Sequence, residues 1–211
     1  MAQNSEQFDI KIVKDNFEAS LLDDDDVRLQ EYLDSYDELN KFFTLMGRMF
    51  GFVSKDLQAK IDILRKFIEE SQENFISAKC MIIYEKDNDL LNKKKYVSGS
   101  RTLLRLHRGL DFIRLFLEKL KDIKNEEGTS TICRAAYDQT LSKHHPYLIR
   151  SGAQVAIYTL PTKEVLLQRV CGDEKVILEA MELLPHTLEI TSLVYDRLEN
   201  MYTEHKLHDL P

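Results

Sequence analysis

The 211-residue sequence contains no tryptophan, only seven glycines and four prolines, and no run in which valine, isoleucine or threonine alternates with polar residues between turn signals. Strands and hairpins depend on turn residues such as glycine and proline and on that alternation, so the scarcity of both predicts an all-α fold with almost no sheet. No run of eighteen apolar residues is present, and the first ten residues lack the basic and apolar regions of a signal peptide. We therefore expect a cytoplasmic protein that neither spans a membrane nor is secreted.

The sequence also lacks the patterns of several reactive sites. Its cysteines, Cys80, Cys133 and Cys171, are odd in number and widely spaced, with no C-x-x-C pair and no histidine at zinc spacing. It has neither a Gly-x-Ser-x-Gly motif nor a glycine-rich phosphate loop, and its net charge of −7 disfavours nucleic acid as a partner. These absences predict reduced thiols and no metal or cofactor. Because no repeat, low-complexity tract or linker is present, we expect residues 1–211 to form one domain.

Apolar residues recur at helical spacing along most of the chain. The second predicted helix is long and is expected to bend near Gly47 or Gly51, and the last predicted helix is expected to break at Pro185. The predicted helices cover approximately residues 8–17, 31–70, 74–91, 98–120, 129–143, 147–160, a segment that begins at 161–164, and 173–205.

The helix predicted over residues 98–120 carries the most information, and its expected cap is formed by Gly99 and Ser100. Its apolar face follows steps of three and four residues, at Leu103, Leu106, Leu110, Ile113, Leu117 and Leu120. A polar wedge on the same helix is expected to face water and consists of His107, Asp111, Arg114 and Glu118. A separate stripe, which we expect to face inward, begins with arginines and continues into apolar residues: Arg101, Arg105, Arg108, Phe112, Leu115 and Phe116.

Three inward-facing arginines need an anionic partner, because a desolvated guanidinium costs several kcal/mol unless it is paired. One interpretation is an internal ion pair with a carboxylate from another helix. The other is a site for an anionic head group attached to a hydrocarbon tail, since the arginine stripe leads directly into apolar residues. The residues themselves leave both open.

Asp56 and Lys60 form a second unusual pair, within the helix predicted over residues 31–70. Their spacing of four residues is typical of an ion pair on an exposed helix face. Both residues lie in line with apolar positions of that helix, among them Met49, Phe52 and Val53. We therefore expect the pair to be shielded from solvent.

Two further segments have either a structural or a functional interpretation. The loop with Lys93, Lys94 and Lys95 is either simply solvated or attracted to an anionic membrane surface. His145 precedes Pro146 at the start of a predicted helix, so it either caps that helix or contacts a ligand.

Five segments, FGFVSKDLQAK, SRTLLRLHR, HHPYLIR, TLPTKEV and LHDLP, occur in the order and spacing of the glycolipid transfer protein superfamily, which this chain resembles from end to end. The resemblance implies a two-layer sandwich of about eight helices with a lipid pocket between the layers. It also implies non-enzymatic transfer of a lipid between membranes by a monomeric, cytoplasmic protein. Peripheral association with the Golgi, the plasma membrane and the nuclear envelope is part of the same expectation.

The resemblance assigns roles to particular residues. Asp56 should accept hydrogen bonds from the sphingoid amide and hydroxyl, and His145 should hydrogen-bond the amide carbonyl. The phosphate should be held by three cations, Lys60, Arg101 and Arg105. An apolar pocket for the hydrocarbon chains is expected to include Met49, Phe52, Val53, Phe112 and Phe116. Contact with anionic membranes is expected from Tyr147, Lys93, Lys94 and Lys95, although relatives specific for phosphate often carry tryptophan in place of Tyr147.

Two departures bear on the cargo. The glycolipid-binding branch pairs its aspartate with an asparagine four residues later and stacks a tryptophan on the sugar, whereas this chain has Lys60 at that position and no tryptophan. Arginine meets phosphate oxygens in pairs and lysine adds a point charge, so the expected cargo is ceramide-1-phosphate or a related phosphosphingolipid.

Two other classes of function stay open at this point. A lipid-phosphate hydrolase would use His145 and Asp56 as acid and base, although no nucleophile or metal set is evident in the sequence. A helical scaffold would use the apolar faces to bind protein partners. Whether Arg108 contacts a ligand is also undetermined.

Overall fold

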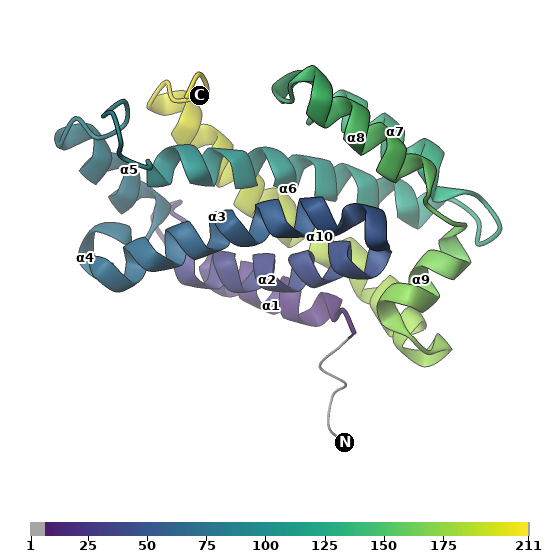
Figure 1. Cartoon of the computed structure of the whole chain (residues 1–211). Helices are drawn as coiled ribbons and strands as arrows, with labels where there is room; N and C mark the ends of the chain where they lie inside the picture. The colour runs from purple at the N-terminus through teal and green to yellow at the C-terminus, as the bar shows by residue number, and fades with distance from the viewer. Residues whose placement is uncertain (1–6, 211) are drawn as a thin grey trace.

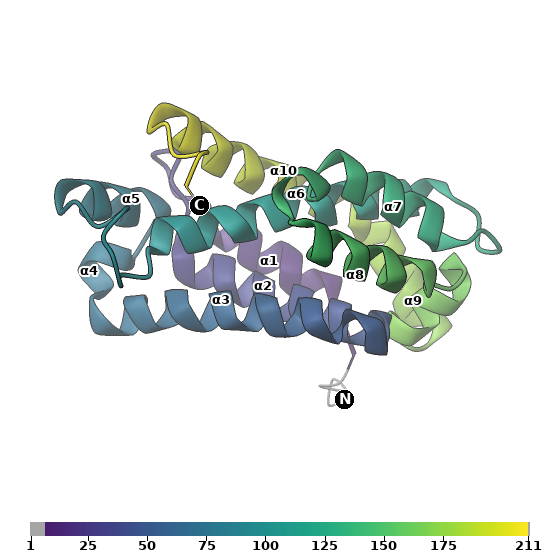
Figure 2. The ribbon, with the colours of Figure 1, turned by 45° about the horizontal axis from the view of Figure 1, so that its top comes forward.

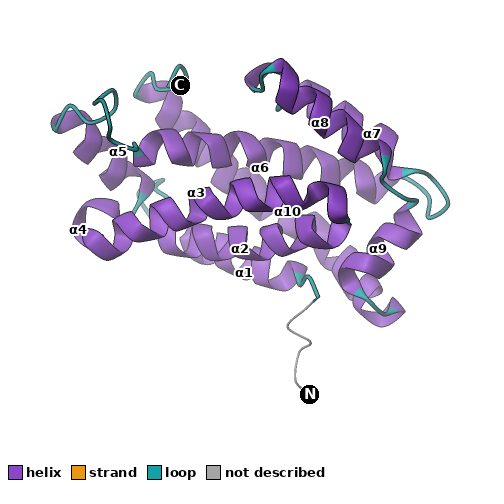
Figure 3. Ribbon diagram, in the orientation of Figure 1, coloured by secondary structure: helices purple, strands orange, loops and turns teal. Residues whose placement is uncertain are grey.

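The computed structural model describes residues 7–210, in which all the regular elements are helices (Figure 3). Residues 1–6, part of the segment in which no signal peptide is expected, and Pro211 of the LHDLP motif lie outside that range. Two short 3-10 helices, η1 (Arg48–Phe50) and η2 (Ser142–His144), precede α3 and α8. The α-helices are α1 (Ile10–Ser20), α2 (Leu29–Met46), α3 (Gly51–Glu70), α4 (Gln72–Phe75), α5 (Ala78–Asp87), α6 (Gly99–Asp122), α7 (Thr129–Gln139), α8 (Tyr147–Tyr158), α9 (Lys163–Cys171) and α10 (Glu174–Glu204).

The long helix α6 lies at the centre of the packing, where it contacts α3, α5, α7 and α10. The helices stack in two layers, with α7 and α8 lying over the C-terminal half of α6 (Figures 1 and 2). The predicted apolar face of α6 is buried throughout, at Leu103, Leu106, Leu110, Ile113, Leu117 and Leu120. Burial of such faces contributes about 25 cal/mol per Å² of apolar surface, which stabilises the contact between the layers. The all-α, two-layer prediction is confirmed, although the described helices are more numerous than eight.

The predicted helix over residues 31–70 consists of two antiparallel helices. After α2 ends, Gly47 adopts a φ of 140°, which residues with a side chain rarely take, and the chain reverses direction. Arg65 of α3 consequently faces the first half of α2, where it donates hydrogen bonds to Asp34 at 2.7 Å and Asp37 at 2.5 Å. The expectation of a bend was right about the glycine, but the bend is a complete reversal.

Two other expected helix boundaries are wrong. The segment 74–91 divides into α4 and α5 at Ser77, whose hydroxyl accepts a hydrogen bond from the backbone N–H of Cys80. In contrast, α10 continues through Pro185 without a break. Leu184 and Leu188, on either side of the proline, are buried, so packing against the core maintains the helix despite the missing N–H.

His107 of α6 is buried and does not face water as predicted. Its Nε2 lies 2.6 Å from a carboxylate oxygen of Glu199 on α10, and its ring stacks on Tyr195 with 4.4 Å between centroids. Because both partners come from a helix distant in sequence, the spacing within α6 could not reveal them.

Candidate functional site

A cavity of about 630 Å³ opens between α3, the middle of α6 and the segment that leads from α7 into α8. Ligand pockets usually measure about 300–1,000 Å³, so the volume suits a bound molecule. On α6, the lining residues Arg105, Arg108, Gly109 and Phe112 follow one another at steps of one to three residues. On α3, the lining residues include Asp56 and, one turn later, Lys60. The two helices thus present the two unusual charged faces of the sequence to the same space.

Most of the cavity wall is apolar. Its apolar lining residues are Phe43, Phe50, Phe52, Val53, Leu57, Phe112, Ile113, Leu141, Ile149, Ala153, Ala156 and Ile157. Of the residues predicted for an apolar pocket, Phe52, Val53 and Phe112 line the wall. The other two do not: Met49 is 43% exposed, and Phe116 is fully buried behind Phe112, with 6.1 Å between the parallel rings. Helical spacing correctly placed Phe116 on the same face of α6 as Phe112, but Phe116 lies one turn farther along the helix, where that face is covered by the core.

Two of the charged lining residues, Asp56 and Lys60, form an ion pair. Nζ of Lys60 lies 2.5 Å from a carboxylate oxygen of Asp56, and Lys60 is largely shielded whereas the Asp56 side chain is 67% exposed. The expectation that both would be shielded from solvent is therefore wrong for Asp56. With Arg105 and Arg108, the wall carries three cations against one carboxylate. The lining residues thus hold an excess of two positive charges when the histidines are neutral.

His145 lies on the opposite wall of the cavity, directly before Pro146, which caps α8. Its Nδ1 is 2.9 Å from the hydroxyl of Tyr137 on α7, which fixes the orientation of the ring. Burial lowers the pKa of His145; the Asp56 carboxylate opposes this shift and Lys60 adds to it. His145 is therefore held neutral and can donate or accept a single hydrogen bond toward the cavity through its other nitrogen.

Two lining residues were not assigned a role from the sequence. Burial and then the nearby charge of Arg105 lower the pKa of Arg108, and burial, Arg108 and Lys143 lower the pKa of His144 to about 4. These shifts share one cause besides burial, which is the excess of positive charge around the cavity. Arg108 could have been placed from the arginine stripe, but His144 had no signal beyond its position beside His145.

Arg101 lies one turn before Arg105 on α6 but does not line the cavity. Its guanidinium donates a hydrogen bond of 3.3 Å to the carbonyl of Leu91. Its predicted contact with a phosphate stays a prediction.

The start of α6 is fixed by a buried carboxylate that the sequence did not reveal. Glu85 of α5 accepts four hydrogen bonds, from Tyr96 Oη, Ser98 Oγ and the backbone N–H groups of Gly99 and Ser100, at distances of 2.6–2.9 Å. The cap is Ser98, whose hydroxyl accepts from the N–H of Arg101, and not Gly99 and Ser100 as predicted. A carboxylate at a helix N-terminus is also stabilised by the helix dipole.

Large apolar side chains are exposed beside the cavity. Tyr147 is 77% exposed and Leu148 is 80% exposed at the start of α8, and Lys93, Lys94 and Lys95 are exposed between α5 and α6. The turn before α8 and the loop between α5 and α6 both lie along the upper side of Figure 1. Among residues 7–210, the helices are too short or too polar to cross a bilayer.

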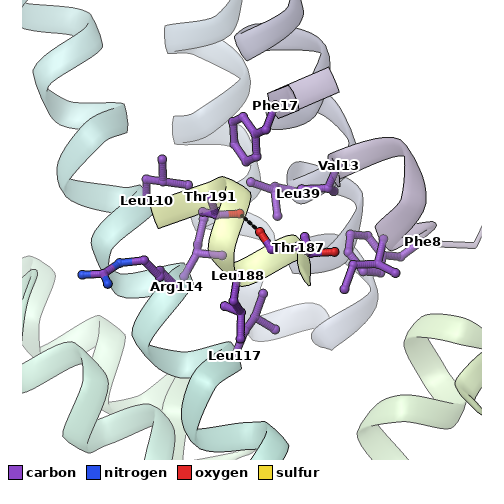
Figure 4. Close-up of a pocket in the computed structure, with 12 residues that line it drawn as sticks. Phe8, Val13, Phe17, Leu39, Leu110, Arg114, Leu117, Thr187, Leu188 and Thr191 are labelled. Carbon is purple, nitrogen blue, oxygen red and sulfur yellow. Dashed lines mark hydrogen bonds between the residues drawn. The ribbon is translucent and has the colours of Figure 1, made fainter. Parts of the chain in front are cut away.

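A second, much smaller void lies between α1, α6 and α10 (Figure 4). Its volume is about 10 Å³, roughly the space of one water molecule. In Figure 4 the Arg114 guanidinium points away from the void, and Thr191 bonds to the carbonyl of Thr187 within α10. The void is a gap in core packing and is too small for a ligand.

Comparison with known proteins identifies the family to which this arrangement of helices and charges belongs. The model of the glycolipid transfer protein (GLTP) family matches residues 27–172. The chain belongs to the glycolipid transfer protein family. The matched region contains α2 to α9, and with them every lining residue of the cavity.

Within the family, the chain is similar to proteins named ceramide-1-phosphate transfer protein. It is 35% identical to the Danio rerio protein of that name, over 98% of this chain and all of the relative. The mouse ceramide-1-phosphate transfer protein in its apo form superposes with a TM-score of 0.89 and 36% identity, over 97% of this chain and all of that one. The human protein in complex with 12:0 ceramide-1-phosphate gives 0.87 and 33%, with the same coverage.

Proposed function

We propose that this chain moves ceramide-1-phosphate between membranes without a covalent step, with residues 1–211 acting as one monomeric lipid-binding domain. The observation that carries the proposal is that one cavity joins a cationic region to an apolar wall. A phosphate monoester on two hydrocarbon chains has the matching distribution of charge and apolar surface. The human relative bound to 12:0 ceramide-1-phosphate supports the same class of cargo.

The apolar wall would lower the barrier to leaving a membrane. Each lipid methylene moved into water costs about 0.8 kcal/mol, so a sphingolipid with on the order of thirty methylenes is effectively confined to its bilayer. Burial of the chains against residues such as Phe50, Phe112 and Ile157 replaces contact with water by contact with apolar side chains. A carrier of this kind needs no nucleophile or acid–base pair.

The phosphate would be held by the cations of the cavity. Lys60, Arg105 and Arg108 line it, and Arg101 lies one turn before Arg105, nearer the N-terminus of α6. The excess of two positive charges on the wall matches a phosphate monoester, which carries about −1.5 to −2 at neutral pH. Guanidinium groups meet phosphate oxygens in pairs, which gives the site a preference for phosphate over an uncharged head group.

The amide region of the lipid would be recognised by Asp56 and His145. The carboxylate of Asp56 is exposed and can accept hydrogen bonds from the amide N–H and the hydroxyl of the lipid. In the tautomer in which Nδ1 of the neutral imidazole accepts from the Tyr137 hydroxyl, Nε2 of His145 carries the proton and can donate to the amide carbonyl. These contacts are common to all sphingoid lipids, so phosphate selectivity would come from the cations alone.

We further propose that the protein docks on anionic membrane surfaces through Tyr147 and Lys93–Lys95, at cytoplasmic faces that by family resemblance include the Golgi, the plasma membrane and the nuclear envelope. Tyrosine suits the interface between water and lipid, and each lysine near an anionic surface contributes about 1 kcal/mol. Tyr147→Ala, and separately the triple alanine variant of Lys93–Lys95, should slow transfer from anionic vesicles while leaving the binding of a soluble short-chain lipid intact.

The matched control for docking is Tyr158→Ala. Tyr158 is as exposed as Tyr147 but lies at the other end of α8, about 16 Å along the helix. Its replacement should leave the transfer rate unchanged. Equal slowing by both tyrosine variants, or by neither, would place the docking surface elsewhere.

The proposed cargo is tested by native mass spectrometry of protein purified from cells, followed by transfer assays with fluorescent lipids. We expect a bound species with the mass of a phosphosphingolipid, and transfer of ceramide-1-phosphate but not of a glycosylceramide. Release of inorganic phosphate from the lipid would instead support a hydrolase. Recovery of no lipid, together with no transfer, would support a scaffold.

A further inference from the structure

Residues 207–210, which we call the post-α10 turn, follow α10 and lie against α6 (Figures 1 and 2). The carbonyl of His208 in this turn accepts a hydrogen bond of 2.6 Å from Nη2 of Arg108. Arg108 also lines the large cavity. A single guanidinium therefore connects the cavity with a segment one hundred residues away in sequence, which belongs to the LHDLP motif and has no role in the function proposed above.

The post-α10 turn is held firmly in place. Leu207 and Leu210 are 7% and 8% exposed, and the N–H of Leu207 donates to the carbonyl of Tyr202 at 2.9 Å. The turn begins after Lys206, whose φ of 56° redirects the chain at the end of α10. The side chain of His208 is 3.0 Å from the Thr203 hydroxyl. The His208 carbonyl is thus a fixed acceptor.

A fixed acceptor would orient Arg108 toward the phosphate site. An arginine has five N–H donors, and a bond from one of them to a rigid carbonyl leaves the others for a ligand on the cavity side. The positive charge of Arg105 disfavours the charged form of Arg108, whereas the carboxylates of Asp209 and Glu199 favour it. Holding the side chain before the ligand arrives reduces the entropy lost on binding.

We propose that the post-α10 turn is a positioning element: it holds Arg108 in the orientation that recognises the lipid phosphate. The proposal rests on the function proposed above and names a second region of the chain that contributes to its selectivity. Leu210 does not line the cavity, so its influence on the ligand must pass through the turn and Arg108.

A double-mutant cycle with Leu210→Ala and Arg108→Ala tests this coupling. Dissociation constants would be measured for short-chain fluorescent ceramide-1-phosphate and for the matching ceramide. Arg108→Ala should weaken ceramide-1-phosphate about tenfold, and Leu210→Ala about threefold, with ceramide unchanged. In the Arg108→Ala background, adding Leu210→Ala should have no further effect on ceramide-1-phosphate.

The control is Leu167→Ala on α9. Leu167 is as buried as Leu210 but lies outside the cavity wall and the turn, so its replacement should lower the melting temperature without changing the affinity ratio of the two lipids. Leu210→Val is a milder variant in case Leu210→Ala does not fold, and should shift the ratio in the same direction.

The outcomes separate the two proposals. Equal effects of Leu210→Ala in both backgrounds, or equal weakening of both lipids, would overturn the positioning role while leaving lipid transfer intact. Wild-type protein that binds ceramide-1-phosphate no more tightly than ceramide would overturn the phosphate site itself, and with it the positioning role.

Discussion

At the N-terminus of α6, the buried carboxylate of Glu85 accepts hydrogen bonds from four donors of the same chain. About two turns farther along the helix, Arg105 and Arg108 join Lys60 around a cavity whose lining includes a single carboxylate, Asp56. Glu85 is buried, whereas the cavity combines the shielded Lys60 with the exposed Asp56 and Arg105. The first charge is hydrogen-bonded by groups of the same chain, whereas the residues that line the second region carry an excess of positive charge.

The difference separates a structural charge from a charge available to a ligand. The four donors around Glu85 hold the loop between α5 and α6 and the start of α6 in place, which sets the position of the arginines that follow. The lining residues of the cavity carry more positive than negative charge, and burial, followed by the nearby charge of Arg105, lowers the pKa of Arg108. An anion from outside the chain would balance that excess of positive charge. Removal of the Glu85 carboxylate should therefore lower mainly the stability of the fold, whereas removal of a cavity cation should lower mainly the affinity for the lipid.

The largest expected effect is on stability at Glu85. Glu85→Ala leaves four donors without an acceptor, three of them buried and the Tyr96 hydroxyl half-buried. Each unpaired buried donor costs about 1–3 kcal/mol, and water that enters the site recovers part of this cost. We expect a loss of about 3–5 kcal/mol in the free energy of unfolding. Chemical denaturation measures this loss. Glu70→Ala, at an exposed carboxylate on α3, is the control and should change the free energy by less than about 0.5 kcal/mol. A loss for Glu85→Ala no greater than the control would mean that Glu85 is not a structural charge.

The next effect concerns affinity and selectivity at the cavity. Lys60→Asn removes one cation and should slow transfer of ceramide-1-phosphate by about a decade, the equivalent of 1.4 kcal/mol. It should not create glycolipid transfer, because the chain has no tryptophan to stack on a sugar. Lys66→Asn, an exposed lysine of the same helix outside the cavity wall, should transfer at the wild-type rate. Gain of glycosylceramide transfer by Lys60→Asn would refute this explanation of selectivity.

The smallest effect is a dependence of stability on pH. The pKa of His144 falls from 6.5 unfolded to about 4 folded, so the unfolded state binds more protons between these values. The contribution of His144 to the free energy of unfolding is therefore fully present above pH 6.5 and is lost as the pH falls toward 4. We would measure the free energy of unfolding of wild type and His144→Gln by urea denaturation at pH 7 and pH 4.5. Between pH 7 and pH 4.5, it should decrease less for the variant than for wild type. An equal decrease would mean that burial and the nearby positive charges do not lower the pKa of His144.

Periodicity within single helices predicted much of the fold and part of the candidate site. The steps of three and four residues placed Arg105 on one cavity wall and Asp56 with Lys60 on another, because neighbouring positions on one helix face depend only on local geometry. His107 was misplaced because its partner, Glu199, comes from a distant helix. For the same reason, the spacing of residues within α6 could not predict the hydrogen bond from Arg108 to the His208 carbonyl.

Arg105→Leu tests the central claim most directly, because Arg105 lines the cavity and its side chain is exposed. We expect ceramide-1-phosphate affinity to fall by about 1.5–3 kcal/mol, or one to two decades, while the melting temperature stays the same or rises. Arg134→Leu, at an exposed arginine of α7 outside the cavity wall, should change neither quantity. If Arg105→Leu unfolds the protein while its folded fraction keeps wild-type affinity, Arg105 belongs to an internal ion pair and the phosphate site is wrong.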